Sequence, residues 1–98
     1  MEQNSYARKK FWEALNILVG DGPLRKRFGF VYGMLLILNV EKDFPEDLRE
    51  RFTKLIGQMD ERKVGGQNGP IEINVDPPLS DELAEEVLAI YTNLRGGI

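Results

Sequence analysis

The most apolar segment of the chain reads FGFVYGMLLILNV and runs from Phe28 to Val40, about 13 residues without a charged side chain. As a helix it is too short to span a bilayer core of about 30 Å, so we expect it to be buried in protein and the chain to stay away from membranes. Asp21, Gly22 and Pro23 precede it as a turn with a helix-start signal. The pattern therefore predicts a helix over residues 24–39.

Apolar side chains cover nearly the whole surface of this predicted helix. One set follows the spacing of a single helical face, and it comprises Leu24, Phe28, Val31, Leu35 and Leu38. A second set fills most of the remaining surface and comprises Phe30, Tyr32, Met34 and Ile37. Such a helix is either the central element of its own domain or part of an interface with another chain. Gly29 and Gly33 would allow a neighbouring backbone to approach it closely.

Three further segments carry apolar residues at the three-and-four spacing of a helical face. The first covers residues 6–19, the second begins near Asp43 with Pro45 in its first turn, and the third begins at Ser80 as N-cap. Their apolar stripes are Phe11, Ala14, Leu15 and Leu18; Leu48, Phe52, Leu55, Ile56 and Met59; and Leu83, Val87, Ile90, Tyr91 and Leu94. Four helices of this size fit one bundle.

A loop and a short extended segment separate the last two predicted helices. Residues 64–70 are rich in glycine, which predicts a flexible loop. Ile71, Ile73 and Val75 then alternate with polar residues in the period of a strand. Because the chain shows no other strand pattern, the segment over residues 71–75 either pairs with a second copy or remains an irregular connection.

These patterns together predict a mainly α fold. We expect a small four-helix bundle-like domain with one short extended segment near residues 71–75. At 98 residues, the chain is expected to be a single helical domain over residues 1–98, with a flexible loop at about 64–70.

The composition removes many kinds of chemistry, because the chain contains neither cysteine nor histidine. Disulfides, thiolate metal sites and the commonest general base near neutral pH are therefore excluded. We expect no catalysis and no cofactor or metal. The residues at the start, from Met1 to Ser5, do not read as a secretory signal, so we expect a cytoplasmic protein.

Two basic clusters suggest an anion site. Residues 1–42 hold seven Lys/Arg against four Asp/Glu, whereas residues 43–98 hold six against twelve. The clusters lie near two predicted helix starts and comprise Arg8, Lys9, Lys10, Arg25, Lys26 and Arg27. Cations at a helix N-terminus oppose the helix dipole, which favours a role in binding phosphate or nucleic acid. The net charge of −3 makes nucleic acid an unlikely partner, and the simpler explanation is solvation or pairing with the acidic half.

The last predicted helix carries four carboxylates, including Glu82, Glu85 and Glu86. This segment of about a dozen residues resembles the paired-glutamate helix of the all-α nucleotide pyrophosphohydrolases, which would imply a bound Mg²⁺. That family carries a second acidic motif on a following helix, which this sequence does not show. A charged, solvated helix face is the expected alternative.

These patterns thus favour a small non-catalytic protein-interaction or scaffold module, working with a protein partner or as a homodimer. The expected interface residues are Trp12, Phe30, Tyr32, Met34, Ile37, Ile71, Ile73 and Val75. The alternative is a regulatory domain that binds nucleic acid or a phosphate-bearing ligand through residues 8–10 and 25–27.

Overall fold

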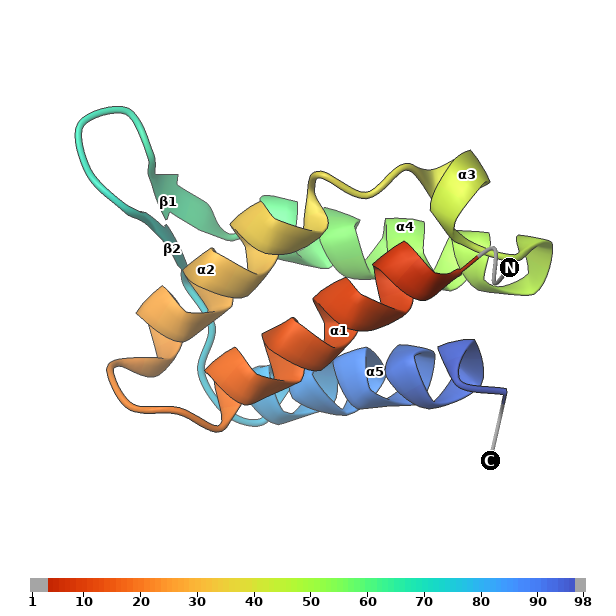
Figure 1. Ribbon diagram of the computed structural model, residues 1–98. Coiled ribbons are helices and arrows are strands. Elements are labelled where there is room, and N and C mark those ends of the chain that lie inside the picture. The colour runs from red at the N-terminus through yellow and green to blue at the C-terminus, as the bar shows by residue number, and fades with distance from the viewer. Residues whose placement is uncertain (1–3, 97–98) are drawn as a thin grey trace.

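Helices dominate the computed structural model, which describes residues 4–96 (Figure 1). Within that range the elements are α1 (Ser5–Leu18), α2 (Leu24–Leu35), α3 (Val40–Asp43), α4 (Glu46–Asp60), β1 (Lys63–Gly65), β2 (Ile71–Ile73) and α5 (Leu79–Leu94). The four longer helices correspond to the four predicted ones, which confirms the mainly α fold class. Helix α1 packs against α2 on one side and α5 on the other, and α1 and α5 lie side by side in opposite directions (Figure 1).

Three of the long helices begin directly after a proline. Pro23, Pro45 and Pro78 occupy the positions before α2, α4 and α5. Proline suits a helix start because its restricted φ is close to the helical value and its missing N–H would have had no helical partner there. Ser80, expected to be the N-cap of the last helix, instead lies inside the first turn of α5 and is buried.

Helix α2 ends at Leu35, four residues before the predicted end at Asn39. The reason is a capping interaction that begins a new element. The Asn39 side chain accepts hydrogen bonds from the backbone N–H groups of Glu41 and Lys42, and the Asp43 carboxylate accepts one from the Asn39 N–H. This reciprocal arrangement favours the start of a helix over the continuation of α2, and it produces the unpredicted α3.

The extended segment predicted at residues 71–75 pairs with another strand of the same chain. The expectation that the chain holds no strand partner for it was therefore wrong. Strands β1 and β2 pair antiparallel, with Lys63 opposite Ile73 and Gly65 opposite Ile71. The first of these strands occupies part of the predicted loop at 64–70. The pattern was missed because β1 has only three residues, all exposed, and therefore no alternation of apolar and polar positions.

The hairpin is held against the helices by a close crossing of α2 and β2. At Gly29, an added Cβ atom would lie 1.9 Å from the carbonyl oxygen of Ile71, so only glycine permits this approach. At Gly33, one helical turn further on, an added Cβ would meet nothing within 4 Å. The close approach predicted for both glycines is thus confirmed for Gly29 and wrong for Gly33.

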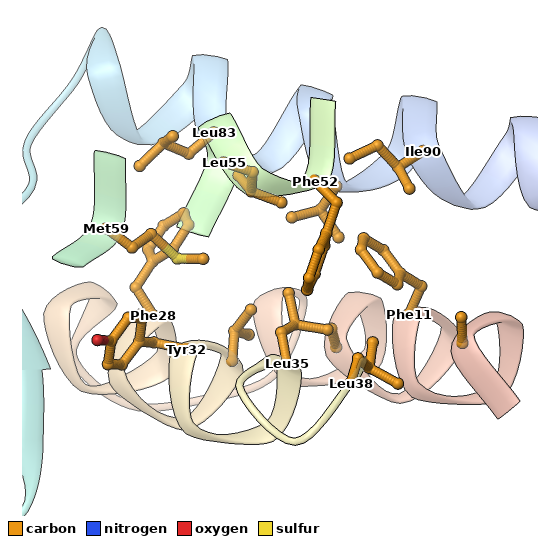
Figure 2. Close-up of a cluster of buried hydrophobic side chains, with 14 of the residues drawn as sticks. Phe11, Phe28, Tyr32, Leu35, Leu38, Phe52, Leu55, Met59, Leu83 and Ile90 are labelled. Carbon is orange, nitrogen blue, oxygen red and sulfur yellow. The ribbon is translucent and has the colours of Figure 1, made fainter. Parts of the chain in front are cut away.

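The core fills the space between α1 and α2 on one side and α4 and α5 on the other (Figure 2). Phe11 of α1 points towards Phe52 of α4, with ring centroids 6.1 Å apart. Phe44 lies edge-on to Phe11 at 6.0 Å and stacks on Phe52 at 4.2 Å. These three rings join α1, α4 and the segment between α3 and α4, in geometries that aromatic pairs favour.

Tyr32 joins α2 to the end of α4. Its ring is buried, and its hydroxyl donates a hydrogen bond of 2.5 Å to a carboxylate oxygen of Asp60. This hydrogen bond, together with burial and the negative charge of Asp60, raises the pKa of Tyr32 to about 12. All three effects favour the neutral phenol over the phenolate.

We expect one of the three tyrosines to ionise only near pH 12, and Asp60→Ala to bring that ionisation back towards the ordinary pKa near 10. Because the pKa is raised on folding, the stabilisation is present below about pH 10 and is lost as the pH rises from 10 towards 12. A spectrophotometric titration of tyrosinate absorbance measures this, with Tyr32→Phe as the control that removes the late step. Simultaneous ionisation of all three tyrosines near pH 10 would contradict the assignment.

Candidate functional site

Several large hydrophobic side chains remain about half exposed or more, although the core is closed without them. Among the described residues they are Tyr6, Trp12, Val19, Phe30, Leu36, Ile37, Val64 and Leu88. Single exposed apolar residues are common on protein surfaces, so only those that gather together indicate a site.

One gathering lies where α1 and α5 run side by side. Trp12 is 53% exposed and its ring lies 5.9 Å from that of Tyr91, and the Arg95 guanidinium lies 5.8 Å from the centre of the Tyr91 ring. These three side chains and Arg8 line an open pocket of about 440 Å³. Leu88, half exposed and one helical turn before Tyr91, extends the apolar surface. We call these five residues the Trp12 face.

The local sequence explains why Trp12 points outward. Phe11 is fully buried, and successive side chains on a helix are rotated by about 100°, so Trp12 points away from the core-facing stripe that contains Phe11. On α5, Leu88, Tyr91 and Arg95 follow one another at steps of three and four and therefore share one side of the helix. Trp12 was among the expected interface residues, whereas Tyr91 was assigned to the apolar stripe of the last helix and Arg95 to no site. The only sequence signal for these partners was their spacing with Leu88.

A second exposed surface runs along the outside of α2 and the turn after it. Phe30 is 66% exposed and Ile37 is 57% exposed, whereas Met34 between them is partly buried. The open side of Gly33 lies on the same helix. This surface is apolar, and Leu36 in the turn also lines an apolar pocket of about 230 Å³ between α2 and α4. Among the described residues it carries no paired aromatic rings.

The other expected interface residues are occupied within the chain. Tyr32, Ile73 and Val75 are at most 3% exposed and belong to the core, so none of them is offered to a partner in this fold. Ile71 is partly buried where β2 crosses α2. The apolar residues that alternate over residues 71–75 thus pack against this chain's own helices and not against a partner.

The structure does not bring the two basic clusters together. Residues 8–10 lie near the start of α1, whereas residues 25–27 begin α2, just beyond the far end of α1. A helix rises about 1.5 Å per residue, so about 12 Å of α1 separates Lys10 from Leu18. The six cations therefore do not form one anion site.

Several of these cations already have structural partners. Arg27 donates hydrogen bonds to the carbonyl oxygens of Leu18 and Gly22 and so holds the turn between α1 and α2. Arg25 pairs with Asp76 at 2.9 Å, on the segment that follows β2. Lys10 pairs with Glu13 at 3.3 Å, while Lys9 and Lys26 are exposed. Arg25 and Arg27 thus connect structural elements and do not face a common ligand.

The acidic residues of α5 are also divided. Glu86 receives two hydrogen bonds of 2.9 Å from the Arg51 guanidinium, which joins α5 to α4 and raises the pKa of Arg51. Within residues 4–96, no three acidic side chains come close enough to hold a metal ion. The likeness of this helix to the pyrophosphohydrolases therefore has no matching geometry in the described part of the chain.

Another open hollow, of about 620 Å³, is lined by residues of the hairpin. It is lined by Lys63, Ile71 and the glycine-rich residues between them, and Lys63 is the one charged side chain in this lining. This lining holds no aromatic ring and no arginine, so it is a weaker candidate for a docking surface than the Trp12 face.

Comparison with known protein families, characterised proteins and solved structures finds no match to this chain. Of the helices in the described part of the chain, none is sufficiently long and apolar to cross a membrane. The function must therefore be argued from the geometry of the surface itself.

Proposed function

We propose that this chain is a non-catalytic protein-interaction module and that the Trp12 face is its docking surface. The observation that carries the proposal is the open pocket lined by Trp12, Tyr91, Arg8 and Arg95. Trp, Tyr and Arg are the residue types that contribute most binding energy at protein interfaces. A partner side chain entering this pocket would contact two aromatic rings and two guanidinium groups.

The setting of the face supports this proposal. Both helices beneath it are anchored in the core through residues such as Phe11 and Ile90, which are fully buried. A docking surface on rigid helices loses less conformational entropy on binding than a flexible loop would. The apolar surface on α2 offers a second contact area, as a scaffold would need. We further propose a cytoplasmic setting, since a chain without cysteine needs no oxidising compartment.

Photo-crosslinking in the native cell tests the proposal. We expect a photoreactive benzoylphenylalanine in place of Trp12 to form covalent adducts with protein on illumination, because a docked partner would lie against this position. The matched control places the same residue at Glu50, an exposed position on α4 outside the Trp12 face.

The proposal predicts strong adducts from position 12 and weak or no adducts from position 50. Equal yields from the two positions, or no protein adduct from position 12, would overturn it. The mass of the adduct reports the kind of partner, because a second copy adds another 11.2 kDa and any other protein adds a different mass.

A further inference from the structure

The charges on α5 are arranged in two groups along one stripe. Asp81, Glu85, Leu88, Thr92 and Arg95 follow one another at steps of three and four, so they share one side of the helix. The acidic members lie in its first half and the basic member at its end, with the apolar side chain between them. Thr92 is partly buried, and the other four are exposed.

Helix α1, which packs against α5, adds a second cation to the basic end of this surface. Helices α1 and α5 run in opposite directions (Figure 1), so the start of α1 lies beside the end of α5. Arg8 and Arg95 accordingly line the same pocket. The Trp12 face is therefore basic at one end. Asp81 and Glu85 are not among its five residues, but they continue the exposed stripe of α5 beyond Leu88. The combined surface is therefore acidic at its other end, with the aromatic and apolar side chains in the middle.

We infer that the Trp12 face binds a second copy of this chain in an antiparallel, two-fold arrangement, with Arg95 of each copy paired with Glu85 of the other. The inference rests on the proposed function and names its partner. Glu85 and Arg95 are ten residues apart, about 15 Å along the helix, so a two-fold axis midway between them exchanges their positions. Leu88 and Thr92 of the two copies then meet near that axis, and Tyr91 lies to the side of it, towards Trp12 of α1.

The argument for a second copy is charge complementarity. A face built to bind an acidic or a basic partner would carry one sign of charge, whereas the Trp12 face together with the adjoining Asp81 and Glu85 carries both signs at separate ends. Rotation by 180° places each basic end over the acidic end of the other copy. Antiparallel packing of the two α5 helices also brings the opposite ends of their dipoles together. Such a face is complementary to itself, as a two-fold dimer requires.

Charge exchange between Glu85 and Arg95 provides the test. We expect the wild-type mass in solution to approach twice 11.2 kDa with rising concentration, measured by light scattering. Arg95→Glu and Glu85→Arg each place like charges opposite one another, so each variant alone should dimerise about tenfold or more weakly. The controls are Lys42→Glu and Glu50→Arg, which make the same charge changes on exposed positions of α3 and α4 and should dimerise as the wild type does.

The mixture of the two single variants is the decisive sample. One copy then carries arginine at both positions and the other carries glutamate at both, so every cross pair is attractive and a heterodimer should form. Trp12 is the only tryptophan in the chain, and its emission should shift to shorter wavelength as the dimer forms. Circular dichroism of each variant establishes that it is folded.

Two results would overturn the inference: a wild-type chain that stays at 11.2 kDa at high micromolar concentration, or a mixture of variants that associates no better than its components. If the chain does not self-associate, the crosslinking experiment shows whether the proposed function also fails. Position 12 would then give adducts with another protein if the module binds one, and no adducts if the proposed function is also wrong.

Discussion

Replacing Gly29 with alanine is expected to destabilise the protein by about 3 kcal/mol, although alanine is the better helix former by about 1 kcal/mol. The added Cβ would lie 1.9 Å from the Ile71 carbonyl oxygen and 2.8 Å from its carbon. Both atoms belong to the backbone of β2, which cannot rotate away as a flexible side chain could. Either the crossing of α2 and β2 opens or the hairpin leaves the helix, and the burial of Ile73 is lost with it.

Gly33→Ala is the matched control, because it makes the same chemical change in the same helix. An alanine Cβ there meets nothing within 4 Å, so this variant should be as stable as the wild type or more stable by up to about 1 kcal/mol. Urea unfolding followed by circular dichroism measures both free energies of unfolding. Equal effects of the two substitutions would mean that the close crossing does not exist.

Replacing Phe11 with alanine is expected to lower the free energy of unfolding by about 3–5 kcal/mol. Phe11 is fully buried, and its ring contacts those of Phe44 and Phe52. The cavity left behind would lie between helices, where both sides are held by other contacts and cannot collapse completely. A domain of this size has a total stability of roughly 5–15 kcal/mol, so the variant would lose a large part of it.

Thermal unfolding provides the measurement, since each kcal/mol lowers the Tm of a domain this small by roughly 4–8 °C. The Phe11→Ala variant should therefore lose roughly 12 °C or more. Phe30→Ala removes the same side chain from a position that is 66% exposed, and its free energy of unfolding should change by no more than about 0.5 kcal/mol. A Tm of Phe11→Ala close to that of Phe30→Ala would show that the aromatic group is not part of the core.

The long helices were predictable because their signals are local. Apolar spacing and the prolines at positions 23 and 45 act within a few residues, so they can be recognised without knowing the rest of the fold. The end of α2 was predicted four residues too late, since apolar residues continue to Leu38 and the spacing alone does not show where the helix stops. The stop depends on the Asn39 side chain, whose ability to cap the next turn outweighs the helical pattern before it.

The expected interface residues were only partly correct, because the sequence does not show which apolar side chains remain exposed after packing. Apolar character alone does not distinguish Phe30, which is exposed, from Tyr32, which packs inward two residues later. The angular position on the helix and the location of its neighbours decide between them. Likewise, Trp12 was identified from its place beside Phe11, whereas Tyr91 and Arg95 join it only because α1 and α5 lie antiparallel.

The sequence by itself determined the helical class, the positions of the four long helices and the exclusion of cysteine and histidine chemistry, because these depend on local spacing and composition. The tertiary structure alone decided that β1 pairs with β2, that Gly29 and not Gly33 receives a neighbouring backbone, and that the two basic clusters lie apart. The physical reason is the same in each case. These features join groups far apart in the chain, and their energies depend on distances that only the packed helices establish.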